Sequence, residues 1–279
     1  MSLRIGYVRE HFSTPLLQFQ DADQNATFTL VECPSGTGQL ISRLTKDEID
    51  VAIALTDPLI SGIANGSTAY KLCGSYVSTP LNWAVITGKD TDFKDISDLK
   101  GTPIGISRLG SGSQTMASVM ALQQGWPTED LKFKINNDIR GLIDSVNDGS
   151  TSAFMWEWFT TKPFVDAGEA RFIGSIPTPW PSWLIAAHPS PSRAPPEALR
   201  TFMAALSGYV RAFDSAANRA GPNLEAWLKT VAYPEDCLAI PSKVITDTLS
   251  VLEKAGVVKA PEGGFDVGHF VATDITKLT

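Results

Sequence analysis

The sequence predicts an α/β fold of two lobes, each with a mostly parallel sheet flanked by helices, joined by two crossover strands. Both halves of the chain alternate short apolar runs, which are typical of strands, with segments whose apolar residues recur at helical spacing. The order of these elements in the first half recurs about one hundred residues later at low sequence identity, which indicates repeated architecture and not a solenoid. Alternation of strands with helices favours a parallel sheet covered on both faces.

Local patterns place the elements of the first half. Leu3–Val8 opens the chain as an apolar strand, and Phe28–Val31 is a second strand candidate. Thr37–Thr45 has helical spacing, and the apolar run Val51–Leu55 after it predicts a third strand. A further apolar run, Leu81–Thr87, stands apart from the surrounding helices, so we expect it to be a crossover strand.

The second half repeats this alternation. Pro103–Ser107 predicts a strand, and the loop Gly110–Ser113 opens directly into a helix that has Met116, Val119 and Met120 on one face. The remaining elements are, in chain order, the strand Leu131–Ile135, the helix Ile139–Val146, the strand Ala153–Trp156 and the return crossing Trp180–Ala186.

Helices dominate the last third of the chain. From Glu197, apolar residues at helical spacing predict an amphipathic helix of about five turns. Asn223–Thr230 and Lys243–Ala255 are further helix candidates, and we expect the tail Phe265–Thr279 to be an ordered wrap. If these elements pack on the first lobe, lobe I comprises residues 1–84 and 186–279, and lobe II comprises residues 85–185.

Composition narrows the class of partner. The 279 residues are 43% hydrophobic and 19% charged, as in an ordinary globular protein, and the formal net charge is −7. No run of Lys or Arg occurs, which argues against a nucleic acid or a membrane surface as partner. No apolar run reaches transmembrane length, and the strand at Leu3–Val8 leaves no room for a signal peptide. We therefore expect a cytoplasmic protein, although a processed mature form would have the same features.

The three cysteines carry no recognisable chemistry. Cys33, Cys73 and Cys237 are far apart and odd in number, and no Cys/His cluster has the spacing of a metal site. We expect three buried side chains in a reducing compartment, with no metal and no cofactor.

Two loops open helices in the same way, Gly36-Thr37-Gly38-Gln39 and Gly110-Ser111-Gly112-Ser113. The first turn of a helix has unpaired N–H groups and a partial positive charge, so it attracts an anion. Two such termini across one cleft would hold a carboxylate, sulfonate or phosphate. The alternative is that both loops are capped turns, which strand-to-helix junctions need in any case.

Three segments carry a family resemblance: the run from Asp98 to Met120, the LTKDEIDVAIAL element and the NDGSTSAFMWEW element. Together they resemble type II periplasmic-binding-protein folds over roughly residues 1–255, in particular the branch that binds sulfonates, nitrate, taurine or thiamine-precursor pyrimidines. Within that fold the chain is similar to a small eukaryotic (fungal) family with no assigned ligand. The resemblance implies two lobes that close on a ligand in the intervening cleft by a hinge motion.

In open α/β sheets, ligands bind beyond the carboxyl ends of the strands. The residues that follow these strand ends, or that lie on the crossovers, form the candidate ligand site. They are Tyr7, Glu10, His11, Thr37, Gly38, Thr56, Asp57, Asn82, Trp83, Arg108, Ser111, Gly112, Ser113, Trp156, Glu157 and Trp180.

Some of these side chains have two interpretations. His11 is a hydrogen-bond donor or acid–base group, or else a surface histidine at a strand end, whereas His188 and His269 read as exposed loop histidines. Glu10 and Glu157 could bind a cationic part of a ligand, or be solvated.

The aromatic and basic candidates for the ligand site also have alternative interpretations. Trp156, Trp158, Trp180 and Trp183 could form aromatic walls for a flat ligand, or pack in the core near the hinge. Arg108 and Arg140 are the candidate anchors for an anion, with a surface position as the alternative for Arg140.

No catalytic motif emerges. Ser-His-Asp, P-loop, HExxH and GxGxxG patterns are all missing. The sequence therefore favours a non-catalytic protein that binds a small anionic or zwitterionic molecule. The alternative is an enzyme similar to fungal thiamine-pyrimidine synthases, which use a histidine and a lysine with a pyridoxal phosphate-derived substrate. This chain lacks the CCCFC-type motif of that family. A third interpretation, an effector domain of a transcription factor, would need a helix-turn-helix that the chain does not contain.

Overall fold

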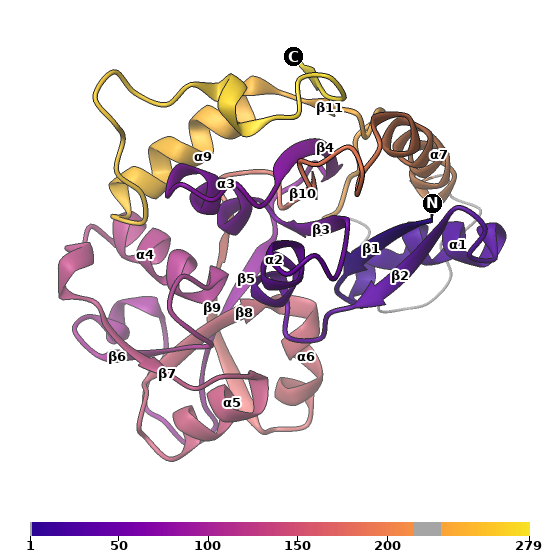
Figure 1. Cartoon of the computed structure of the whole chain (residues 1–279). Helices are drawn as coiled ribbons and strands as arrows, with labels where there is room; N and C mark the ends of the chain where they lie inside the picture. Colours follow the sequence, from indigo (N-terminus) through magenta and orange to yellow (C-terminus); the bar gives the residue numbers. More distant parts are fainter. Residues whose placement is uncertain (1, 215–229) are drawn as a thin grey trace. The chain divides into compact units, whose positions relative to one another are not determined.

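The computed structural model describes residues 2–214 and 230–279, which form two compact units (Figure 1). Unit 1 comprises Met1–Pro80, Trp180–Leu249 and Lys259–Thr279, and unit 2 comprises Leu81–Pro179 and Ser250–Val258. The helix predicted at Asn223–Thr230 lies, apart from its last residue, outside the described residues.

Unit 1 is built on a five-stranded sheet in the order β2-β1-β3-β10-β4. β1 pairs in parallel with both β2 and β3, whereas β10 runs antiparallel between β3 and β4. Four of the five strands therefore share one direction, and the fourth place in the sheet is taken by a strand of opposite direction. The bounds are β1 Leu3–Tyr7, β2 Phe28–Glu32, β3 Val51–Leu55, β4 Lys71–Val77 and β10 Trp183–Ala187.

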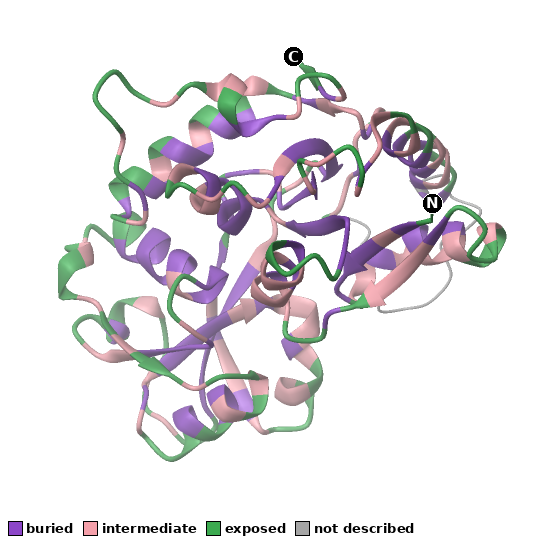
Figure 2. Ribbon diagram, in the orientation of Figure 1, coloured by how far each residue is buried: buried purple, intermediate pink, exposed green. Residues whose placement is uncertain are grey.

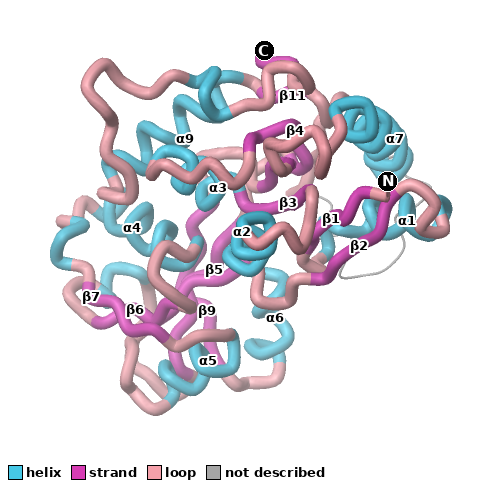
Figure 3. Tube along the Cα trace, in the orientation of Figure 1, coloured by secondary structure: helices cyan, strands magenta, loops and turns pink. Residues whose placement is uncertain are grey.

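Helices and C-terminal segments complete unit 1, and Figure 3 shows helices and strands in separate colours. Short helices connect the consecutive parallel strands along the chain. The helices are α1 Thr14–Asp23, α2 Thr37–Thr45, α3 Thr56–Ala64 and α7 Pro196–Asp214, while α9 Ser242–Lys254 has residues in both units. The tail is ordered, as expected: β12 (Lys277–Leu278) pairs in parallel with β11 (Ala239–Ile240), and Val271 bridges to Leu72 of β4.

Unit 2 repeats the plan with the strand order β7-β6-β8-β5-β9. Here β5 is the antiparallel strand in fourth place, between β8 and β9. The strands are β5 Asn82–Gly88, β6 Pro103–Ile106, β7 Lys132–Ile135, β8 Ala153–Glu157 and β9 Ala170–Pro177, and the helices are α4 Gly112–Gln124, α5 Ile139–Asn147 and α6 Trp158–Asp166. The predicted fold class, two mostly parallel sheets flanked by helices, is confirmed.

The core of each unit follows the strands. β3, β5 and β8 are buried along most of their length, and the exposed residues gather on the outer helix faces and turns (Figure 2). In unit 2 a cluster under α5 joins Phe154 of β8 and Ile86 of β5 to three helix residues, Leu142, Ile143 and Val146. All three cysteines are buried, as expected.

The sequence patterns did not predict α1, α3, β4, α6 or β9. β4 and β9 contain Gly74-Ser75 and Gly174-Ser175, which weaken a strand signal that depends on apolar and β-branched residues. α6 carries Pro163 inside it, a residue that reads as a helix breaker. The return strand also begins later than predicted, at Trp183, because Ser182 donates its N–H outside the sheet, to the carbonyl of Thr79.

Candidate functional site

The strand directions of unit 1 bring several predicted site residues to one edge of its sheet. Tyr7 ends β1, and Thr56 and Asp57 begin α3 directly after β3. Because β10 is antiparallel, its first residue lies at this same carboxyl edge, and Trp180 precedes it by three positions. Asp57, Thr56 and Trp180 are all buried.

The hydroxyl groups of two threonines make hydrogen bonds that connect the loops at this edge. Thr37 Oγ1 accepts a hydrogen bond from the Leu55 N–H at 3.2 Å. Thr56 donates its hydroxyl to the Pro181 carbonyl at 2.5 Å and its N–H to the Ser182 carbonyl at 3.0 Å. Both threonines therefore hold the loops of the edge in place, because their side-chain oxygens are engaged with backbone groups of neighbouring segments.

The first turn of α2 lies beside these bonds. Its N-cap, Gly36, has φ 76° and ψ −162°, a conformation that only glycine adopts without strain. The N–H groups of Thr37 and Gly38 have no intrahelical acceptor, as in any first helical turn. Ser35 donates its N–H to Gln39 Oε1 at 2.9 Å, so a side chain of α2 closes the loop that precedes this helix.

The segment with Glu10 and His11 is held by aromatic residues. Phe12 offers its carbonyl to two tyrosine hydroxyls, Tyr76 Oη at 2.6 Å and Tyr233 Oη at 2.9 Å. Its ring packs against Trp183 in a tilted arrangement, with a centroid separation of 3.8 Å and an interplanar angle of 32°. Sequence reasoning missed Phe12, Tyr76 and Tyr233, since they are ordinary core residues whose joint contact depends on segments far apart in the chain.

In unit 2 the loop after β6 is a compact hydrogen-bonded turn. Ser111 is the N-cap of α4, and its Oγ accepts from Gln114 N–H at 3.4 Å. Ser111 Oγ and Ser113 Oγ lie 2.9 Å apart, and Ser113 Oγ also accepts from Ser107 N–H at 3.3 Å. Ser111 therefore caps α4. Gly112 is the first helical residue, so its N–H has no intrahelical acceptor.

Arg108, at the start of that loop, is partly buried, and burial lowers the pKa of its guanidinium. Its side chain makes no ion pair or hydrogen bond with any of the residues that the structure describes, although arginine side chains that lose water normally gain such a partner. The neighbouring Leu109 is 69% exposed. A partly desolvated cation without a counterion is the strongest electrostatic signal for an anion in this unit.

Glu157, at the end of β8, is buried and caps α6 by accepting the Thr160 N–H at 2.6 Å. The alternative of a solvated carboxylate is therefore wrong, because the side chain is used inside the fold. Trp83 and Asn82 begin β5, and Trp83 is the cross-strand neighbour of Glu157. Trp156 packs against the core cluster of unit 2, on the opposite face of the sheet from Glu157.

Other candidates have partners elsewhere. Arg140 pairs with Asp144 at 2.9 Å and with Glu169 at 2.5 Å, so the surface interpretation holds. Trp158 stacks on Phe172 with centroids 4.0 Å apart.

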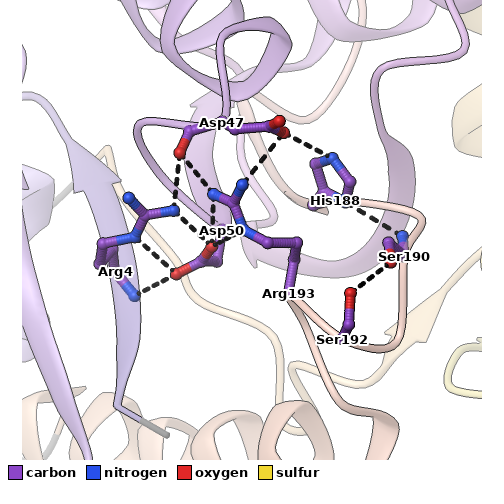
Figure 4. A network of polar contacts seen from close by, with 7 residues as sticks. All are labelled: Arg4, Asp47, Asp50, His188, Ser190, Ser192 and Arg193. Carbon is purple, nitrogen blue, oxygen red and sulfur yellow. Dashed lines mark hydrogen bonds and ion pairs between the residues drawn. The ribbon is translucent and has the colours of Figure 1, made fainter.

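The expectation for His188 is wrong, whereas His269 is exposed as expected. His188 Nε2 lies 3.0 Å from Asp47 Oδ1, and its Nδ1 accepts the Ser190 N–H at 3.0 Å (Figure 4). The same network joins Arg4 and Arg193 to the buried Asp50 carboxylate, which accepts from both guanidinium groups. Its residues flank the amino ends of β1 and β3, the sheet edge opposite to the candidate site.

Among the helices that the structure describes, none combines the length and the apolar character that a bilayer crossing needs. Within the same residues, no group of three or more His, Cys, Asp and Glu side chains is arranged to hold a metal ion.

Comparison with known proteins identifies the family. The Ca3427-like PBP family model matches residues 83–176. The solved CA3427 gene product of Candida albicans, which defines a family with the generic periplasmic binding protein fold, is 32% identical over 100% of this chain and 98% of its own, with a TM-score of 0.85. No curated protein sequence matches.

More distant structures share the fold alone. The alkanesulfonate-binding protein SsuA of Xanthomonas axonopodis pv. citri, solved with MOPS bound, is 17% identical over 99% of this chain and 98% of its own, with a TM-score of 0.74. The aliphatic sulphonate binding protein SsuA of Escherichia coli is 15% identical over 98% of each chain, with a TM-score of 0.69. On the identity and coverage of the Candida structure, the chain belongs to the Ca3427-like family of proteins with the periplasmic-binding-protein fold.

Proposed function

We propose that this protein binds a small anionic or zwitterionic molecule without converting it, and that its two units close over that ligand. The single observation that carries the proposal is Arg108: a partly buried guanidinium with no partner in the described chain, three residues before Ser111, the N-cap of α4. Guanidinium and first-turn N–H groups are both donors suited to an oxyanion.

Proteins that share the fold favour the same class of function. Proteins of related fold include sulfonate-binding proteins, one of them solved with MOPS, a zwitterion that carries a sulfonate. A sulfonate is therefore the first ligand class to test. The carboxyl edge of unit 1, with the first turn of α2, would supply further donors once the ligand is bound.

A thermal-shift titration tests the proposal, with MOPS and methanesulfonate as probes in a Tris chloride buffer. A ligand at about 100 times its Kd stabilises the protein by about 2.7 kcal/mol, which is a shift of several degrees in Tm. Arg108→Gln should abolish that shift, whereas the control Arg140→Gln, which removes a cation already paired on the surface, should keep it.

Three results bear on the proposal. Loss of the shift in Arg108→Gln alone supports it, and a full shift in Arg108→Gln contradicts the Arg108 site. If neither the sulfonates nor a wider set of carboxylates and phosphates stabilises the wild-type protein, the anion-binding function itself is wrong. Small-angle scattering with and without the stabilising ligand then tests closure, which should reduce the radius of gyration.

A further inference from the structure

A cavity lies at the amino edge of the unit 1 sheet, the edge opposite to the candidate ligand site. Its volume is about 280 Å³, close to the lower end of the range for small-molecule sites. Lys71, the first residue of β4, and Ala187, the last residue of the antiparallel β10, both line it. The loop that follows β10 and residues 271–275 of the tail form the other walls, so the whole cavity belongs to unit 1.

The walls of the cavity are mostly apolar. Proline has no N–H group, and the side chains of alanine, valine and isoleucine form no hydrogen bonds, so these walls suit a ligand with an apolar body. The apolar lining includes Pro189, Pro191, Ala194, Pro196, Val271 and Ile275.

Hydrogen bonds and ion pairs within unit 1 fix both walls. On one side, His188 and Arg193 hold the loop after β10 through their contacts with Asp47 (Figure 4). On the other side, the tail is bound to β4, because Ala272 donates its N–H to the Leu72 carbonyl at 2.8 Å. A cavity whose walls are already in place costs a ligand less free energy to enter.

Two residues of opposite charge, Lys71 and Asp274, line the same cavity. Within the described parts of the chain, neither side chain forms an ion pair, with the other or with a third residue. The Lys71 ammonium donates one hydrogen bond, to the His269 carbonyl, and has two further N–H groups to give. A molecule with one carboxylate and one ammonium would complement both charges.

The charged groups of the neighbouring loop and helix are already paired. Arg193 forms an ion pair with Asp50, and Arg200 of α7 forms one with Glu197. His188 uses both ring nitrogens, one toward a carboxylate and one toward a backbone N–H. Among the described residues that line the cavity, Lys71 and Asp274 therefore supply the charges for a ligand.

We propose that this cavity is a second binding site, which takes a small apolar amino acid as its zwitterion. The carboxylate of the ligand pairs with Lys71, its ammonium pairs with Asp274, and its side chain lies against the proline and alanine walls. Lys71 is half-buried and Asp274 is exposed, so the charged end of the ligand lies at the mouth of the cavity. The site is separate from the one assigned to Arg108 and goes beyond the proposed function.

Calorimetry with leucine and two of its analogues tests the inference on the wild-type protein. Isocaproate keeps the apolar chain and the carboxylate of leucine without the ammonium, and isoamylamine keeps the chain and the ammonium without the carboxylate. We expect each analogue to bind about 10-fold more weakly than leucine, because each lacks one charged contact. Glycine, which has no side chain to bury, should also bind at least about 10-fold more weakly.

Two variants assign the charged contacts. Lys71→Met should weaken leucine and isocaproate by about 10-fold and leave isoamylamine unchanged, whereas Asp274→Asn should weaken leucine and isoamylamine and leave isocaproate unchanged. The control is Lys162→Met, which removes an exposed cation paired with Asp166 in unit 2 and should change none of the three affinities. Thermal unfolding of the unliganded variants checks that they fold. If one variant does not fold, the analogues on the wild type and the other variant still decide.

The outcomes separate this inference from the proposed function. If leucine binds the wild type no more tightly than both analogues, or if the two variants do not show the crossed pattern, the inference is overturned. It is also overturned if leucine, valine and phenylalanine all fail to bind the wild type. Arg108→Gln should keep the leucine affinity, and Lys71→Met should keep the thermal shift with methanesulfonate. Loss of leucine binding in Arg108→Gln would place leucine at the sulfonate site, which overturns the second site and leaves the proposed function standing.

Discussion

Thr37 Oγ1 accepts the Leu55 N–H at 3.2 Å, so the first turn of α2 is fastened to the last residue of β3. Thr37 is buried, and its partner lies directly before the buried pair Thr56 and Asp57. A residue that the sequence nominates as a ligand contact therefore also ties two loops of the candidate site together. The hydroxyl oxygen can serve both purposes, because it has two lone pairs and a proton of its own.

Thr37→Val should lower the free energy of unfolding by about 1 kcal/mol, because the valine keeps the shape and leaves the Leu55 N–H without its acceptor. Urea unfolding measures the change. Thr45→Val is the matched control: its hydroxyl bonds the Ile41 carbonyl on an exposed face of the same helix, so we expect a much smaller effect. Equal effects in the two variants would contradict the assigned role of Thr37.

Asp50→Asn should destabilise unit 1 by about 3 kcal/mol, since removing one partner of a buried ion pair leaves the others uncompensated. The carboxylate is buried and accepts hydrogen bonds from the guanidinium groups of Arg4 and Arg193 (Figure 4). The hydrogen bond that Arg4 donates to Asp50 also raises the pKa of the Arg4 guanidinium.

The control for this change is Asp166→Asn, which removes a surface pair with Lys162 and should cost no more than about 0.5 kcal/mol. Chemical denaturation of both variants gives the comparison. A loss below about 1 kcal/mol for Asp50→Asn would show that the network contributes no more than an exposed pair.

Alkaline pH should destabilise the protein through Tyr76. Burial raises the pKa of its hydroxyl well above the ordinary value of 10.0. Above about pH 10 the unfolded chain loses this proton and the folded chain keeps it, so the free energy of unfolding falls by about 1.4 kcal/mol per pH unit for this one group. The stability is complete below that pH and is lost as the pH rises toward the folded-state pKa.

Tyr76→Phe should make the alkaline loss of stability less steep by the equivalent of one proton, measured by urea unfolding at several pH values above about 9. At neutral pH the same variant should be less stable by about 1 kcal/mol, because the Phe12 carbonyl loses a donor. Tyr70→Phe is a matched variant, since burial also raises the pKa of Tyr70. An unchanged slope in both variants would contradict the assigned burial of these hydroxyls.

Local pattern predicted much of the architecture. Thr37–Thr45 and Val51–Leu55 have the predicted bounds, because a helix of regular apolar spacing and a wholly apolar strand are both specified by neighbouring residues. The strands β4 and β9 were missed, since their glycine and serine residues are tolerated only through pairing with β10 and β5.

The sequence predicted which residues lie at the candidate site, but not which of them bind other parts of the chain and which remain unpaired. The rule for strand ends placed Arg108 and Glu157 at the carboxyl edge of one sheet. Their difference came from contacts with other segments: Glu157 caps α6, whereas Arg108 has no partner in the described chain. The prediction for His188 failed for the same reason, because its partner Asp47 is far away in the sequence.

The sequence by itself determined the alternation of strands and helices, the repeated plan of the two halves and the loops that open α2 and α4, because each depends on residues within one turn or one strand. Only the tertiary structure decided that β5 and β10 are the antiparallel strands and take the fourth place in their sheets. This arrangement puts Trp83 and Trp183 at the carboxyl edges of those sheets. It also decided which polar groups are already bonded. Hydrogen bonding and burial depend on residues brought together from distant parts of the chain, so a local sequence pattern cannot predict these contacts.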